Sequence, residues 1–140
     1  MGAWGPGAFE NDAAGDWAWE IEDAATEEDA VRIIESALRV TGGASADQYL
    51  DADQASRALA AAEIVAAALG RTARDLPESV TDWLAAHRQA VPAAMRELAR
   101  AAVARVIGPG SELAELWEES GDRTEWLDQV RGLQRYLAEG

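Results

Sequence analysis

The stretch that decides the fold is ADQASRALAAAEIVAAALG, residues 52–70. Beyond Asp53 it carries only two charged side chains, Arg57 and Glu63. A helix that is apolar on nearly all of its sides is buried on nearly all of them. We therefore expect residues 52–69 to form the central helix of an all-α domain, ending at Gly70, with the other helices packed around it.

Two helices are expected before this one. Asn11 or Asp12 can cap a first helix that runs to about Glu22. Thr26 can cap a second helix, whose first turn is acidic and so matches the positive end of the helix dipole. The glycine pair at residues 42–43 is expected to end it.

Four helices are expected after it. The sequence 79–82 is typical of a helix cap, and Pro92 suits the first position of the next helix, which glycine and proline end at residues 108–110. Two short amphipathic helices follow over 111–119 and 124–138. The pattern predicts a single helical domain over residues 1–140, a compact bundle of about six to seven helices with no strand.

The N-terminal residues MGAWGPGAFE contain four glycines and a proline, so they do not favour a helix. Trp4 and Phe9 are large apolar groups, which disordered tails seldom carry. We expect an ordered Gly/Trp-rich loop. Two interpretations remain open for Trp4, Phe9 and Trp17: the loop binds a ligand or partner, or it closes the apolar end of the bundle. The Asn11 amide would hold the turn of this loop.

Glu63 stands out because its helix is otherwise apolar. A buried carboxylate must be paired, hydrogen-bonded or protonated. Its functional interpretation is a general base or ligand in a cleft. Its structural interpretation is an acceptor for an arginine, an indole or backbone N–H groups.

The acidic residues Asp12, Asp16 and Glu20 recur at four-residue spacing and share one helix face. Carboxylates suit calcium or magnesium, but a straight row cannot wrap around one ion, so we predict a solvated face and no metal site. His87, next to Arg88 near a helix end, is expected to be a surface or capping histidine.

The composition excludes several classes of function. The net charge of −14 disfavours binding to nucleic acid and to anionic membranes, because both depend on lysine and arginine. The chain has no cysteine and one histidine, which excludes disulfides, thiolate sites and multi-histidine metal sites. It has no phosphate loop and no dinucleotide fingerprint, so no cofactor is expected. Lacking an apolar run of membrane length and a signal peptide, the chain is expected to be cytoplasmic.

The opening residues MGAWGPGAFENDAAGDW resemble a bacterial family catalogued as domain of unknown function 4259. The family pattern Met-Gly-x-Trp-Gly-x-Gly-x-Phe-x-Asn-Asp falls here on residues 1–12. The stretches RALAAAEIVAAALG and SELAELWEES are also similar to the family, so the resemblance covers nearly the whole chain. It implies an all-helical fold and a bacterial source, and the arginine-only basic residues favour a GC-rich genome such as that of an actinomycete. It implies no activity and no catalytic residue.

Two functions compete. The first is a non-catalytic protein-interaction module that binds a basic protein, for example an immunity or antitoxin-like protein that neutralises a cationic toxin. The charge, the small size and the lack of catalytic motifs favour it. The alternative is a carboxylate-based enzyme or a divalent-metal binder that uses Glu63 with Asp12, Asp16 or Asp47, which requires these side chains to converge.

Overall fold

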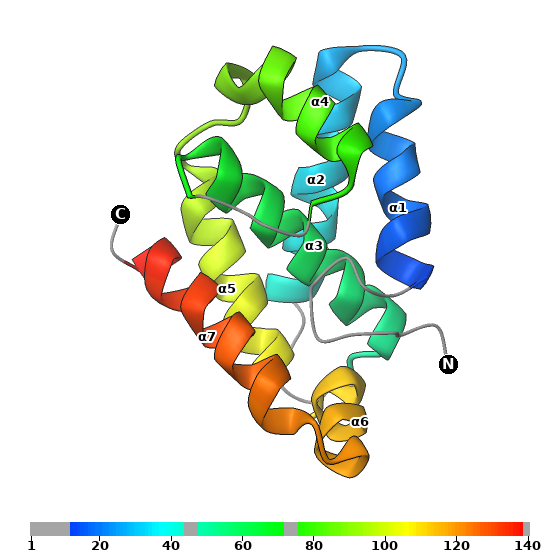
Figure 1. Cartoon of the computed structure of the whole chain (residues 1–140), viewed down its shortest axis with the longest axis vertical. Helices are drawn as coiled ribbons and strands as arrows, with labels where there is room; N and C mark the ends of the chain where they lie inside the picture. Colours follow the sequence, from blue (N-terminus) through cyan, green and yellow to red (C-terminus); the bar gives the residue numbers. More distant parts are fainter. Residues whose placement is uncertain (1–11, 44–47, 72–75, 139–140) are drawn as a thin grey trace.

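The computed structural model describes residues 12–43, 48–71 and 76–138 (Figure 1). Within them the chain forms seven α-helices and one short 3₁₀ helix. The helices are α1 (Asp12–Glu22), α2 (Glu27–Gly42), α3 (Ala52–Ala68), α4 (Glu78–His87), η1 (Arg88–Ala90), α5 (Met95–Ile107), α6 (Glu112–Ser120) and α7 (Arg123–Ala138). The expected helical bundle is confirmed. The N-terminal loop with Trp4, Phe9 and Asn11 lies outside the described residues.

Helix α3 is the centre of the bundle, as its sequence predicts. It contacts α1, α2, α4, α5, α6 and α7, and it crosses the middle of the molecule in Figure 1. Twelve of its 17 residues are buried, and most of these are alanines. Small side chains let the neighbouring helices come close, so the core bulk is supplied by the leucine, isoleucine, valine and tryptophan side chains around α3.

Helix α2 begins and ends where its sequence predicts. The Thr26 side chain accepts a hydrogen bond of 3.1 Å from the Asp29 backbone N–H, which satisfies one of the free donors of the first turn. At the other end, α2 passes close to α5. A Cβ atom on Gly42 would lie 3.2 Å from Ala101 Cβ and from the Ala102 backbone nitrogen, so glycine permits this approach.

Two expected helix starts are wrong. Helix α4 begins at Glu78, before the expected cap at 79–82, and its N-cap residue Pro77 makes no side-chain cap hydrogen bond. Helix α5 begins at Met95 and not at Pro92. The Pro92 carbonyl accepts from the Met95 N–H at 3.0 Å, which closes a turn over the three residues before the helix. At α5, proline therefore sets the turn that precedes the helix rather than its first residue.

Residues 48–52 fasten the start of α3 to the start of α6. Leu50 forms an isolated parallel β-bridge with Ser111, and the Ala52 N–H donates to the Glu112 carboxylate at 2.7 Å. The Tyr49 hydroxyl donates to Glu115 at 2.6 Å. Because its proton is held by a carboxylate, the pKa of Tyr49 is raised to about 12.

Two of the three arginines of α5, Arg96 and Arg105, donate to backbone carbonyls of other segments. Arg96 is half-buried and donates to the carbonyls of Tyr136 and Leu137, at 2.9 and 3.2 Å, near the end of α7. Arg105 is also half-buried and donates to the carbonyls of Gln48 and Pro109. Both therefore connect α5 to its neighbours.

Candidate functional site

The candidate residues that the structure describes lie in different surroundings. Asp12 is the exposed first residue of α1. Trp17, on the same helix, is only 4% exposed and packs into the core. Glu63 lies on α3, where it is half-buried and forms an ion pair with Arg71.

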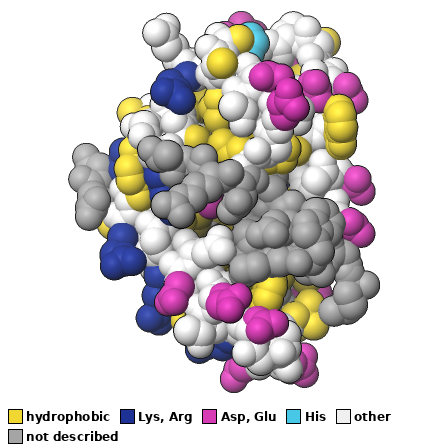
Figure 2. Space-filling model, in the orientation of Figure 1, with side chains coloured by type: hydrophobic (Ala, Val, Ile, Leu, Met, Phe, Trp, Pro, Cys, Tyr) yellow, Lys and Arg dark blue, Asp and Glu magenta, His cyan; other side chains and the backbone are white. Residues whose placement is uncertain are grey.

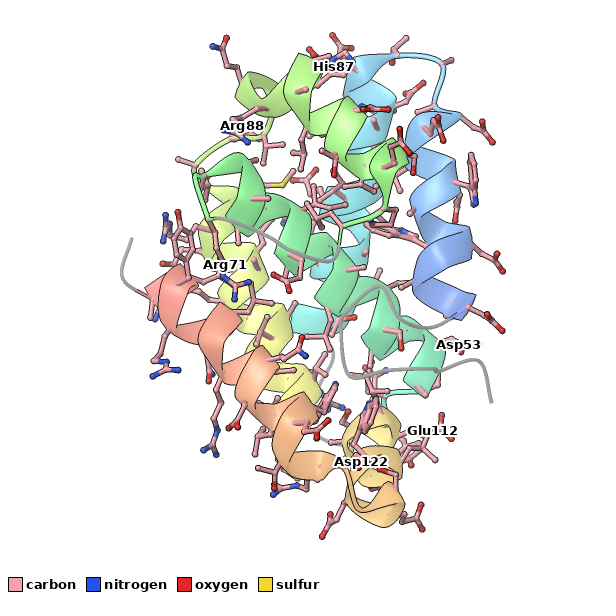
Figure 3. The ribbon with its side chains drawn as sticks, in the orientation of Figure 1. Asp53, Arg71, His87, Arg88, Glu112 and Asp122 are labelled. Carbon is pink, nitrogen blue, oxygen red and sulfur yellow. The ribbon has the colours of Figure 1, made fainter. Side chains whose placement is uncertain are left out.

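The Glu63–Arg71 pair follows from the way α3 ends. Gly70 has a φ of +116°, a conformation that favours glycine, and the Arg71 N–H donates back to the Ala66 carbonyl at 2.9 Å. This turn directs the Arg71 guanidinium back along α3, where it donates to the Glu63 carboxylate. Figure 3 shows Arg71 between α3 and α7. A reactant at Glu63 would have to displace this arginine.

Removing the arginine of this pair should destabilise the protein. We expect Arg71→Met to lower the free energy of unfolding by about 2 kcal/mol, less than for a fully buried pair because the side chains of Arg71 and Glu63 are 25% and 18% exposed. The double variant Arg71→Met/Glu63→Met should be more stable than the single one, because it also removes the half-buried Glu63 carboxylate, which the single variant separates from Arg71. Urea titrations measure both values, and a double variant less stable than Arg71→Met would contradict this account.

A groove of about 710 Å³ runs between α1, α2 and α3. One face of α2 lines it over three turns, with Asp29, Arg32, Ile33, Ser36, Ala37 and Val40. These residues repeat every three or four positions, which places them in a row along the helix. Helix α1 adds Trp17 and Glu20, the loop after it adds Ala24 and Ala25, and α3 adds Gln54 and Arg57. Neither Asp12 nor Glu63 is among the described residues that line this α1–α2–α3 groove.

The walls of the groove carry opposite charges. Glu20 on α1 is exposed. Arg57 on α3 is half-buried and makes no hydrogen bond or ion pair with any residue of the described ranges. Between them, Arg32 donates to Asp29 on the same helix at 3.2 Å. Val40, 55% exposed, provides apolar surface at one end of the row.

A second surface feature is the acidic stretch over residues 12–31. It holds eight carboxylates and no lysine or arginine: Asp12, Asp16, Glu20, Glu22, Asp23, Glu27, Glu28 and Asp29. Trp19 lies among them on α1 and is 59% exposed. We call these eight residues and Trp19 the α1 acidic surface, although Asp23 lies in the loop after α1 and Glu27, Glu28 and Asp29 lie in the first turn of α2. Figure 2 shows Asp and Glu side chains along the edge formed by α1, and arginines along the opposite edge formed by α5 and α7.

His87 lies at a helix end, as expected, but it has a specific partner. It is the last residue of α4, its Nδ1 atom lies 2.5 Å from a Glu27 carboxylate oxygen, and its ring is 5.2 Å from the Trp83 ring. Figure 3 shows it beside the start of α2. A shallow hollow of about 660 Å³ next to this pair is lined mainly by residues 84–90. The pair fastens α4 to α2.

Sequence reasoning missed the groove and the exposed tryptophan. Ile33 and Ala37 have core-like spacing, and the same spacing continues to the exposed Val40. Trp19 follows Trp17 by two positions, which turns the two indoles to different sides of α1. This two-residue spacing could have predicted that one of the two tryptophans is exposed.

In the ranges that the structure describes, no three or more histidine, cysteine, aspartate or glutamate side chains are grouped so that they could hold a metal ion. None of the helices in the same ranges has both the length and the apolar character needed to cross a membrane.

Comparison with known proteins gives one match. The model of a family described as "Domain of unknown function (DUF4259)" matches residues 2–129. No curated protein and no solved structure matches the chain.

Proposed function

Because the chain belongs to the DUF4259 family, whose description names no activity, we propose a function from its surface: a non-catalytic module that binds a basic protein partner. The observation that supports it is the exposure of Trp19, at 59%, among eight carboxylates with no cation in the same stretch. Exposed tryptophan is uncommon on a free surface and is enriched at the energetic centres of protein interfaces.

The two parts of the α1 acidic surface have different roles in this proposal. The carboxylates attract a cationic protein and speed its association, an effect that salt screens. Trp19 supplies contact area that is buried only in the complex, and burial of an indole slows dissociation. An immunity or antitoxin-like protein that neutralises a cationic toxin is one module of this kind, since such a toxin offers the complementary charge.

Capture of partner proteins from a bacterial lysate tests the proposal. The immobilised wild-type chain should retain a basic protein at low salt and release it at high salt. Trp19→Ser should weaken the binding about 30-fold, the effect of losing a central tryptophan contact. The double variant Asp16→Asn/Asp23→Asn should bind more slowly and with a smaller dependence on salt.

The matched control is Glu118→Gln/Glu119→Gln, which removes the same charge from two exposed residues of α6. It should bind the partner as the wild type does. Equal losses in the two charge variants would indicate unspecific ion exchange. That result, or an unchanged affinity in Trp19→Ser, would overturn the proposal.

A further inference from the structure

We infer that the α1–α2–α3 groove is the docking site for one amphipathic helix of the partner, which places its cations against α1 and its carboxylate against Arg57. The inference rests on the proposed function, because it assigns a second contact to the same basic partner. The juxtaposition that carries it is a row of α2 side chains three turns long that lines one groove together with Glu20 of α1 and Arg57 of α3.

The shape of the groove fits a helix. The row from Asp29 to Val40 spans about 16 Å at 1.5 Å per residue, the length of three helical turns. Helices that bind in grooves use anchors at positions i, i+3 or i+4, and i+7, which match a row of this length. Trp17 lines the groove but is almost completely buried, so it forms part of its base and supplies little of the contact surface. Ile33 and Val40 add the apolar contacts along the row.

The charged side chains of the groove predict where the bound helix carries its own charges. Arg57 is half-buried and makes no ion pair with a described residue, so a bound helix would remove more of its water. Desolvating a guanidinium without a partner is unfavourable, and a carboxylate at that position would compensate. On α1, the exposed Glu20 lines the same groove and follows other carboxylates of that helix, so lysine or arginine would be favoured there. The matching helix therefore has an apolar stripe with cations on one side and a carboxylate on the other.

The probe for the test is a phage-displayed library of helical peptides that is selected on the immobilised wild-type chain. Selected peptides should carry the apolar stripe with a basic and an acidic edge, and their affinity is then measured by fluorescence anisotropy on the synthesised peptide. Val40→Glu should weaken binding at least 30-fold, because a charge then lies in the apolar row at a residue that is 55% exposed in the free chain.

Reversing the charge of Arg57 tests the charge pairing more directly than Val40→Glu does. Arg57→Glu should bind the selected peptide at least tenfold more weakly, and a peptide with lysine in place of its matching carboxylate should restore the affinity. Arg131→Glu is the matched control on α7, an exposed arginine far along the chain from the groove, and should leave binding unchanged. The inference is overturned if the library yields no binder, if the binders keep their affinity for Val40→Glu, or if the lysine peptide fails to restore binding to Arg57→Glu.

Trp19→Ser separates this inference from the proposed function. Trp19 is not among the described residues that line the groove, so the selected peptides should bind Trp19→Ser as they bind the wild type. Peptides that meet all of these criteria would establish the groove even if Trp19→Ser captures the lysate partner unchanged, which would overturn only the proposed function. Conversely, a partner that is lost in Trp19→Ser and kept in Val40→Glu would overturn only the groove.

Discussion

Replacing Trp126 by alanine is expected to lower the free energy of unfolding by about 3–5 kcal/mol, the range for removing a buried tryptophan. Trp126 is 3% exposed and lies in the first turns of α7. Its ring stacks on Trp117 of α6 with centroids 6.3 Å apart and planes 9° from parallel. The alanine variant loses this contact and leaves a cavity between the two helices and the core.

Denaturation in urea, followed by circular dichroism, measures the loss. Domains of this size are stable by about 5–15 kcal/mol. We therefore expect the alanine variant to remain folded in buffer and to unfold at a much lower urea concentration than the wild type. Trp126→Phe should lose less, because part of the ring contact remains. Trp19→Ala is the control: with its side chain 59% exposed, we expect a change within about 0.5 kcal/mol. Equal losses at the two tryptophans would contradict the structure.

The second large effect is expected at Ile64, in the middle of α3. Ile64→Ala should lower the free energy of unfolding by about 2–5 kcal/mol. Ile64 is fully buried, and its neighbours along the helix are mostly alanines, which cannot extend into the space that the side chain leaves. The cavity would therefore persist, and the cost of a cavity rises with its residual volume.

The same urea titration tests this prediction with two controls. Ile64→Val removes one methylene and should lose about 0.5–1.5 kcal/mol. Ile33→Ala makes the same change in the α1–α2–α3 groove, at a residue that is only half-buried, and should lose less than Ile64→Ala. If Ile33→Ala proved the more destabilising variant, α3 would not be the centre of the core.

The residues changed in the binding experiments lie outside the core. Trp19 and Val40 are 59% and 55% exposed, so substitutions there change surface that the folded chain does not use. A loss of binding in either variant can then be assigned to the contact itself. The groove and the α1 acidic surface share Glu20 on α1 and Asp29 on α2, which would let one partner contact both.

Signals that act within one helix were predicted well. The start of α1, the Thr26 cap of α2, the extent of α3 and the start of α6 at Ser111 agree with the sequence analysis, because caps and apolar periodicity are local properties. The expected starts of α4 and α5 were wrong; at α5 the reason is that proline is compatible both with a first helical turn and with the turn before it. Which of these two positions the proline takes depends on how the neighbouring segments pack.

The side-chain partners could not be predicted. Glu63 was expected to be paired or hydrogen-bonded, but its pairing with Arg71 depends on the turn at Gly70. His87 meets Glu27 across 60 residues of sequence. Arg96 and Arg105 of α5 reach backbone carbonyls of two distant segments. Each partner is set by how the helices pack.

The sequence by itself determined the all-helical class, the central position of α3 and the acidic balance, since each depends on composition or on periodicity within one segment. The tertiary structure alone decided that Trp17 faces inward while Trp19 stays exposed among carboxylates. It also decided that α1, α2 and α3 leave a groove that both Glu20 and Arg57 line. Such a groove is a property of three packed helices, and the angle and separation of helices depend on contacts between residues far apart in the chain.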